Sequence, residues 1–276
     1  MRELLTMWKN TQMIVLTVLV AAIYAAVLIP FKAIPIIPGI TELRVAQVIP
    51  PVASLLFGPA AAWGSAFGNL IGDFFGTFGP GSFFGFIGNF FLGAVPYVLW
   101  GRLGPLSSGE EPAMRRGKQV GEFVALCAIS GLACAAMIAW GLEVLRILPF
   151  VVLATIIAIN NVVVPAILGP ILLALLYRRV QRMGLVWTDV MPAQDISSRG
   201  PAPIGTALMA IGGVGGWVVG MLVGLGVGEA VGPAGFGQTP GNAAVIATVA
   251  PFMAALLLAL VLARSRPDLF ERRMAM

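Results

Sequence analysis

The sequence predicts an all-α membrane protein with about eight transmembrane helices, six in a bundle followed by a pair. Of its 276 residues, 59% are hydrophobic and only 11% are charged, and the mean hydropathy is +0.95. A soluble domain carries roughly a quarter charged residues, whereas a helix that crosses a bilayer needs about 20 mostly apolar ones. Uncharged runs bounded by charges, Pro or Gly supply the candidate spans, at residues 13–31, 45–57, 60–75, 83–100, 123–142, 149–177, 204–228 and 243–263.

Several runs carry features that predict how each helix is used. The first run has 19 residues, which is longer than the apolar core of a usual signal peptide, and we expect an uncleaved helix. The second run is short and contains Pro50 and Pro51, which predicts a kinked helix buried among others, and the third run is also short. In the fifth run, Cys127 and Cys134 share one helical face but lie ~10 Å apart along the axis, so we expect packing residues rather than a disulfide.

A polar segment at residues 178–199 separates six spans from the last two. We therefore divide the chain into a membrane bundle at 1–180, a cytoplasmic linker at 181–200, and a Gly/Ala-rich transmembrane hairpin with a basic tail at 201–276. Small residues recur about every four positions in the last two spans, a spacing that allows helices to approach closely. They are Gly212, Gly216, Gly220, Gly224 and Gly228, and then Ala243, Ala247, Ala250 and Ala254. The row fits either a tight hairpin packed on the bundle or a docking face for another subunit.

The distribution of basic residues predicts that both termini are cytoplasmic. With that orientation the inner segments hold 14 of the 17 Lys and Arg residues, and only Lys32, Arg44 and Arg146 fall outside. Cytoplasmic loops of membrane proteins carry this excess of positive charge. The same bias accounts for a pI near 9.8 without a nucleic-acid partner.

Intramembrane polar side chains gather between the predicted outer surface and the midplane. Such groups are costly in a bilayer, so they are candidates for function. The Gly- and Phe-rich segment after Asp73 adds aromatic rings that suit a flat ligand. We expect one outward-facing pocket built from Arg44, Gln47, Asn69, Asp73, Phe84, Asn89 and Asn160. The alternative is structural, with Asp73 pairing Arg44 only to fasten two helices.

The residues that the chain lacks exclude several classes of protein. There is no histidine, which leaves little for a metal or haem site, and we predict no catalytic residue, metal or cofactor. A phosphate-binding P-loop is also absent. The only Gly-Lys pair, Gly117–Lys118, has Pro112 in place of the first Gly and Gln119 in place of the hydroxyl residue. If transport is driven by ATP, the motor is another polypeptide.

Four segments carry a resemblance to a known family. They read VLIPFKAIPIIPG, ELRVAQVIPPVASLLFGPAAAWGSAFGNLIGDFFG, GFIGNFFLGAVPYVLWG and PAILGPILLALLYRR. Over residues 10–180 the chain resembles the substrate-binding S components of energy-coupling factor (ECF) transporters. The resemblance implies a six-helix bundle in a prokaryotic cytoplasmic membrane that binds a vitamin or related micronutrient at its outer end. It also implies a transmembrane coupling subunit and two cytoplasmic ATPases as partners.

The family's first helix carries an AxxxA pattern that docks on the coupling subunit. Ala21 with Ala25, and Ala22 with Ala26, both fit this pattern. Small residues four apart form a flat strip for close helix contact. The departure from the family is the C-terminal pair of helices, which the six-helix pattern lacks. It leaves open whether the coupling module is shared, dedicated or absent.

Two other classes of function compete with the S component. An ion-coupled secondary transporter would use Asp73 as a proton carrier and the broken second helix as part of its site. The sequence shows no inverted repeat, which argues against this class. A non-transporting scaffold or small membrane enzyme would need a partner or nucleophile that the sequence does not reveal. The Phe-rich surroundings favour a largely apolar or aromatic ligand with little charge.

Overall fold

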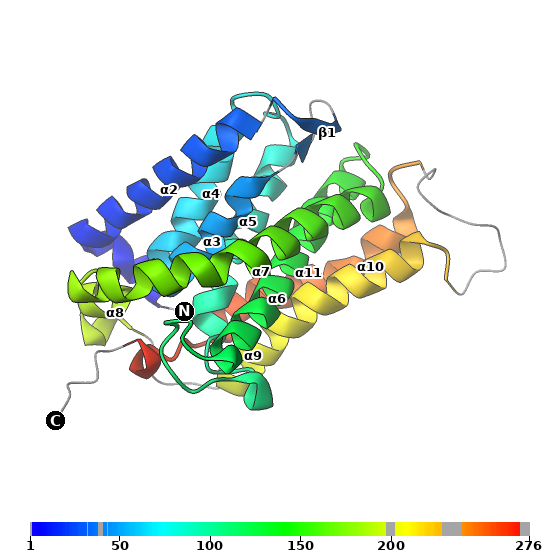
Figure 1. The fold of residues 1–276 in the computed structure, drawn as a ribbon. Helices are drawn as coiled ribbons and strands as arrows, with labels where there is room; N and C mark the ends of the chain where they lie inside the picture. Colours follow the sequence, from blue (N-terminus) through cyan, green and yellow to red (C-terminus); the bar gives the residue numbers. More distant parts are fainter. Residues whose placement is uncertain are drawn as a thin grey trace.

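The computed structural model describes residues 2–31, 33–37, 41–42, 44–196, 202–227 and 239–270. Their regular structure is helical apart from one antiparallel two-stranded hairpin, and the long helices form a bundle (Figure 1). The first half contains α1 (Glu3–Thr6), η1 (Met7–Lys9), α2 (Thr11–Phe31), β1 (Pro35–Ile37), β2 (Thr41–Glu42), η2 (Val45–Val48), α3 (Ile49–Phe57), α4 (Pro59–Asp73) and α5 (Gly81–Leu99). The second half contains η3 (Gly104–Leu106), α6 (Gly117–Val144), α7 (Phe150–Arg182), α8 (Trp187–Val190), η4 (Ala193–Asp195), α9 (Ala202–Ala210), the π-helical η5 (Ile211–Gly215), α10 (Gly216–Gly224), α11 (Ala243–Leu262) and η6 (Pro267–Leu269).

Six helical segments in the described part of the chain are long and apolar enough to cross a bilayer. They are Thr11–Phe31, Gly81–Leu99, Gly117–Val144, Phe150–Val190, Pro203–Gly224 and Ala243–Leu262. The all-α prediction is thus confirmed, and six of the eight predicted runs form full-length apolar helices. The second and third runs form α3 and α4, of 9 and 15 residues, which are shorter than the ~20 residues that a span requires.

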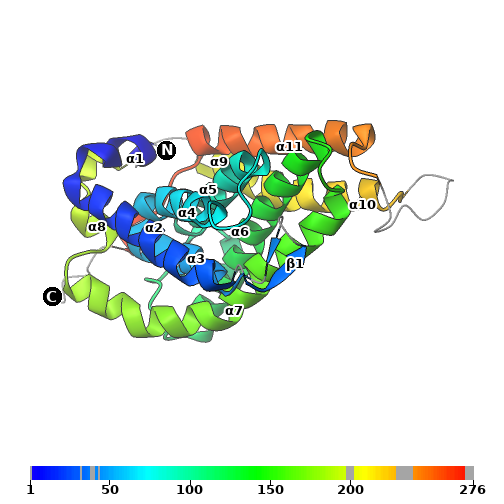
Figure 2. The ribbon, with the colours of Figure 1, turned by 90° about the horizontal axis from the view of Figure 1, so that it is seen from above.

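Helix α3 is a buried internal helix, as its composition predicts, but its prolines do not kink it. Pro50 and Pro51 lie in the first turn, where a missing N–H costs no helical hydrogen bond, and η2 leads directly into them. Viewed from above, α3 lies inside the bundle, and it contacts α2, α4, α5 and α7 (Figure 2). The helix ends at Gly58, whose φ of 50° favours glycine. A Cβ at Gly58 would lie 2.6 Å from Trp187 Cγ, so the turn into α4 also excludes a side chain.

Helices α2 and α4 pack closely because α4 presents glycines to α2. A Cβ at Gly68 would lie 2.8 Å from Tyr24 Cδ1 and 2.9 Å from the Ala21 carbonyl oxygen. The contact buries Ala21 and Ala25, which are 5% and 4% exposed. Ala22 and Ala26 lie on the exposed side of the same helix.

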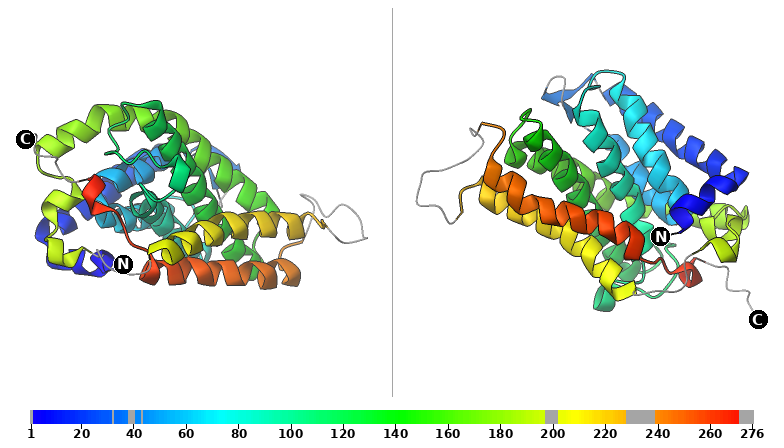
Figure 3. Two further views of the ribbon diagram at one scale, coloured as in Figure 1. Left: turned by 90° about the horizontal axis from the view of Figure 1, so that it is seen from below. Right: turned by 180° about the vertical axis from the view of Figure 1, so that it is seen from behind.

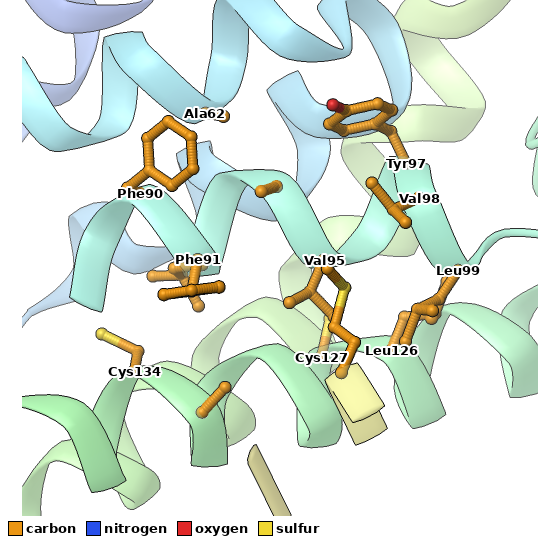
Figure 4. Close-up of a cluster of buried hydrophobic side chains, with 14 of the residues drawn as sticks. Ala62, Phe90, Phe91, Val95, Tyr97, Val98, Leu99, Leu126, Cys127 and Cys134 are labelled. Carbon is orange, nitrogen blue, oxygen red and sulfur yellow. The ribbon is translucent and has the colours of Figure 1, made fainter. Parts of the chain in front are cut away.

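The core between α5 and α6 is apolar and contains both cysteines. Phe91 and Val95 of α5 point toward Cys134, Cys127 and Leu126 of α6 (Figure 4). All five side chains are fully buried, and the cysteines are free. The prediction that Cys127 and Cys134 are packing residues is confirmed.

The C-terminal helices lie beside the bundle. Helix α10 runs alongside α11, and both contact α6 (Figures 1 and 3). A Cβ at Gly212 would lie 2.8 Å from Leu256 Cγ, and one at Gly220 would lie 2.4 Å from Phe150 Cζ. The glycine row therefore faces α11 and α7, which favours packing over a free docking face. Gly228 of that row lies outside the described residues.

The Glu143 carboxylate fastens these helices to the bundle. Its Oε1 accepts hydrogen bonds from the backbone N–H groups of Gly241 and Asn242, at 2.6 and 2.7 Å, and Oε2 accepts one from Phe150 N–H. Asn242 in turn caps α11, because its Oδ1 accepts from the N–H groups of Ala244 and Val245. One buried carboxylate thus connects the C-terminal end of α6 with the starts of α7 and α11.

Candidate ligand-binding site

A cavity of about 210 Å³ lies at the end of the bundle that carries the α4–α5 and α6–α7 connections. In Figure 1 this is the end marked by β1, away from the N-terminus. The wall comes from the chain before η2, the C-terminal part of α4, the start of α5, α6 and α7. It is lined by Arg44, Asn69, Asp73, Thr77, Phe78, Gly79, Pro80, Gly81, Ser82, Gly85, Ile138, Leu142, Ile147, Leu153 and Ile157.

A chain of hydrogen bonds runs along the polar wall. Arg44 Nη1 donates to Asn69 Oδ1 at 2.9 Å, and Asn69 Nδ2 donates to Asp73 Oδ2 at 3.2 Å. The Thr77 hydroxyl donates to Asp73 Oδ1 at 2.9 Å. Asn69 and Asp73 are 1% and 4% exposed. Asn69 therefore links the arginine to the carboxylate in a nearly buried part of the cavity wall.

Asp73 accepts hydrogen bonds on both oxygens of its carboxylate. The Asn69 amide donates to Oδ2 and the Thr77 hydroxyl donates to Oδ1. Gly85 of α5 lies opposite, where a Cβ would be 3.1 Å from Asn69 Nδ2 and 3.6 Å from Asp73 Oδ2. The absent side chain at Gly85 leaves room beside Asn69 and Asp73.

Gln47 and Asn89, both predicted at the site, belong to a second polar group that does not line the cavity. The Tyr24 hydroxyl lies 2.8 Å from Gln47 Oε1 and 2.9 Å from Asn89 Oδ1. Asn89 Nδ2 also donates to the carbonyl oxygen of Gly85 at 2.9 Å. Gln47 and Asn89 are 1% and 0% exposed, so they join α2, η2 and α5 directly beneath the cavity wall.

Asn160 and Phe84 are also placed behind the wall rather than on it. Asn160 Oδ1 accepts a long hydrogen bond, 3.5 Å, from the backbone N–H of Arg44. The Phe84 ring fills a notch on α6, because a Cβ at Gly141 would lie 2.0 Å from its Cγ. It also meets Trp140 edge to face, with ring centroids 6.2 Å apart. Of the seven predicted residues, Arg44, Asn69 and Asp73 line the cavity.

Several lining residues escape prediction from the sequence. Thr77 and Ser82 come from the Gly-rich connection, and Thr77 lies four residues after Asp73, a spacing that could have indicated a contact. Phe78 supplies a ring at the wall, and Phe74 stacks on it with centroids 4.4 Å apart. The apolar wall uses Ile138, Leu142, Ile147, Leu153 and Ile157 of α6, α7 and their connection, which carry no signal distinct from ordinary core residues.

The predicted docking quartet divides into two pairs. Ala21 and Ala25 face α4 and are buried in the chain's own core, so they are not available to another subunit. Ala22 and Ala26 are exposed and lie four residues apart on one face of α2. Val18 is 62% exposed one turn earlier, which extends the same apolar stripe. Any docking strip on α2 is therefore the Ala22 and Ala26 pair with its neighbours.

A family model described as QueT transporter matches residues 14–178, which is more than half of the chain. The chain belongs to the QueT transporter family. Comparisons with curated proteins and with solved structures give no match.

The QueT match confirms the resemblance to S components of ECF-type transporters, and QueT is a transporter family rather than an enzyme family. S components of this family serve micronutrient uptake and work with ECF modules in general. The matched region runs from α2 to α7 and includes every residue that lines the cavity. Helices α1, α10 and α11 lie outside it.

Proposed function

We propose that this QueT-family protein is the substrate-binding subunit of an ECF-type importer and captures a queuosine precursor, a 7-deazaguanine base. The observation that carries the proposal is the hydrogen-bonded polar wall of Arg44, Asn69 and Asp73 in a cavity within the family-matched region. The family match supports this choice of substrate class, since QueT is a family for queuosine precursors.

The polar wall complements the hydrogen-bonding edge of a guanine-type base. That edge presents two adjacent N–H donors beside a carbonyl oxygen. A carboxylate accepts two parallel N–H bonds, and a guanidinium donates to a carbonyl. We assign Asp73 to the two donors of the base and Arg44 to its carbonyl, with Asn69 holding the two side chains in register.

The cavity size and apolar walls fit a single bicyclic base. Its volume of about 210 Å³ is below the ~300–1,000 Å³ of pockets for drug-sized ligands. Ile138, Leu142, Leu153 and Ile157 would cover the ring faces, and Phe78 would close the opening. A nucleoside or nucleotide would need more room than these walls enclose.

We propose that the cavity opens to the outside and that both termini are cytoplasmic in a prokaryotic cell membrane. The bias of basic residues supports this orientation. Arg102, Arg179, Arg182 and Arg264 lie near the ends of α5, α7 and α11 that are remote from the cavity. We propose further that α9–α10 and α11 form a transmembrane hairpin added to the family's bundle.

The proposed partners are a transmembrane coupling subunit and two cytoplasmic ATPases. The exposed pair of Ala22 and Ala26 would form the contact with the coupling subunit, since small residues allow two helices to approach closely. The chain has no P-loop of its own, so energy must come from these partners or from an ion gradient.

Reconstitution in liposomes separates these two sources of energy. The chain is incorporated alone, or together with the coupling subunit and ATPases, and accumulation of 7-aminomethyl-7-deazaguanine is measured. We expect accumulation only with the full complex and ATP. Accumulation by the chain alone under an imposed proton gradient, lost in Asp73→Asn, would instead establish an ion-coupled transporter.

A further inference from the structure

A second, larger hollow lies on the outside of the bundle, between α1, α4, α5 and α11. It has a volume of about 590 Å³ and is a groove more open than the ligand cavity. Its apolar wall includes Leu5, Trp63, Phe86, Phe90, Leu257 and Val261, and its charged lining residues are Arg2 and Arg264. The groove and the ligand cavity share no lining residue.

The aromatic side of the groove is a connected set of rings. Trp63 meets Phe90 edge to face with centroids 4.9 Å apart, and Phe67 meets Phe86 at 5.3 Å. The indole N–H of Trp63 donates to the carbonyl oxygen of Leu4 at 2.9 Å, which ties α1 to α4. Because these rings pack against one another, the aromatic side of the groove is fixed by contacts within the protein.

The opposite side of the groove carries exposed apolar side chains. Leu5 is 71% exposed, Leu257 50% and Val261 64%. These side chains belong to α1 and α11, which lie outside the region that the QueT family model matches. One side of the groove therefore comes from elements outside the matched region, and the other side comes from α4 and α5 within it.

Positive charge is confined to one end of the groove. Arg264 follows α11, and its Nη1 donates to the carbonyl oxygens of Val261 and Ala263 at 3.0 and 3.1 Å. Arg2 precedes α1, and Figures 2 and 3 show the N-terminal end beside the C-terminal end of α11. Two guanidinium groups therefore flank the groove at the end of the bundle remote from the ligand cavity.

We propose that this groove binds one anionic phospholipid, with an acyl chain along the apolar wall and the phosphate between Arg2 and Arg264. Basic pockets between helices at the cytoplasmic face are suited to anionic head groups. On α5, the groove reaches Phe86, thirteen residues before the helix ends at Leu99. This rise is ~20 Å, enough to cover the ~15 Å hydrocarbon depth of one leaflet.

Charge complementarity favours a lipid over an apolar protein helix as the occupant. An acyl chain alone would need only the apolar wall, whereas two arginines in the lining add positive charge that suits an anion. The proposal concerns a different surface from the ligand cavity and does not depend on which base the cavity binds.

Native mass spectrometry of the purified protein with added lipid tests the proposal. We expect retention of one phosphatidylglycerol and weaker retention of phosphatidylcholine. Each substitution, Arg2→Gln or Arg264→Gln, is expected to weaken phosphatidylglycerol binding about fivefold, and the double variant roughly 25-fold, from ~1 kcal/mol for each basic residue near an anionic surface. Lys118→Gln, an exposed basic residue on another helix, is the charge-matched control and is expected to leave retention unchanged.

A second pair of variants tests the acyl-chain part of the site without changing charge. Leu257→Trp fills the groove, whereas Leu258→Trp alters a neighbour that is equally exposed, at 50%, but does not line it. We expect loss of the retained lipid only in Leu257→Trp. Equal retention of both lipids, or equal loss in the arginine variants and Lys118→Gln, overturns the proposal. So does unchanged lipid retention in Leu257→Trp combined with loss of coupling-subunit association, because the groove would then be a protein contact.

Discussion

Asn69 and Asp73 lie one turn apart on α4 and are joined by a 3.2 Å hydrogen bond from Asn69 Nδ2 to Asp73 Oδ2. Arg44 donates to the same asparagine at 2.9 Å, so one amide holds an arginine and a carboxylate at fixed positions on the cavity wall. In the proposed complex, this relationship would let a nearly buried polar group offer both a donor and an acceptor to the ligand.

Replacing Asp73 with Asn is expected to weaken binding of the base about 10- to 100-fold. A hydrogen bond to a charged group contributes about 1.5–3 kcal/mol, and each 1.4 kcal/mol is about tenfold in affinity. Isothermal titration of the purified variant measures the change. Asp268→Asn, at an exposed carboxylate far along the chain, is the control, and equal effects of the two substitutions would contradict the assignment.

Asn69→Ala and Asn89→Ala are expected to act differently although both residues are buried amides. Asn69 lines the cavity, so its loss should weaken affinity about tenfold by freeing Arg44 and Asp73. Asn89 contacts Tyr24 and the Gly85 carbonyl, so its loss should lower the melting temperature and change affinity less. Thermal unfolding measures the melting temperature of both variants, and titration measures their affinity for the ligand. The reverse ranking would place Asn89, not Asn69, against the ligand.

Ala22→Trp is expected to abolish association with the coupling subunit while leaving ligand affinity and stability unchanged. Ala22 is exposed on α2, so a Trp there prevents close helix contact without disturbing the core. Co-purification of the tagged protein with its partners is the measurement. Ile171→Trp, at a 58% exposed position on α7, is the matched control and should associate normally.

Ala25→Trp should instead disrupt the protein itself. Its side chain is 4% exposed in the contact with α4, and overpacking a filled contact costs about 1–3 kcal/mol or more. We expect a lower melting temperature and loss of ligand binding. A stable Ala25→Trp variant that binds ligand but not the coupling subunit would show that Ala25 contacts the coupling subunit.

Glu143→Gln is expected to loosen the C-terminal helices. In the wild type, the carboxylate accepts hydrogen bonds from the backbone N–H groups of Phe150, Gly241 and Asn242. In the variant, the side-chain NH₂ group would face at least one of these N–H donors and could not accept its hydrogen bond. The expected loss of stability is about 1.5–3 kcal/mol. Faster hydrogen exchange at the start of α11 would show that the C-terminal helices are loosened. Exchange equal to that of a Glu110→Gln control would contradict this expectation.

The sequence predicts how deep a polar side chain lies in the membrane better than it predicts the direction in which the side chain points from its helix. Arg44, Gln47, Asn69, Asp73, Asn89 and Asn160 share similar predicted depths, yet only Arg44, Asn69 and Asp73 line the cavity. Asn69 and Asp73 are four residues apart and must share a face. Nothing in the sequence indicates that the Tyr24 hydroxyl contacts the side-chain oxygens of Gln47 and Asn89, because a tyrosine in an apolar run looks like a core residue.

The direction of a side chain around its helix also decides which alanine pair of α2 is buried and where the Phe84 ring points. Neighbouring alanines differ by ~100° around a helix, so one AxxxA pair can face α4 while the other is exposed. The sequence alone does not say which pair does so; the glycines of α4 decide it. Phe84 is directed into α6 by Gly141, a residue 57 positions away, and such a long-range fit has no local signal.

Titration of 7-aminomethyl-7-deazaguanine into the purified wild-type protein tests the central claim most directly. We expect saturable binding of one base per chain, competed by guanine-type bases and not by adenine, which lacks the carbonyl and the adjacent N–H donors of that edge. Saturable binding that is competed equally by adenine, or no binding heat at all from a folded protein, would contradict the assignment of the Arg44–Asn69–Asp73 wall to this ligand.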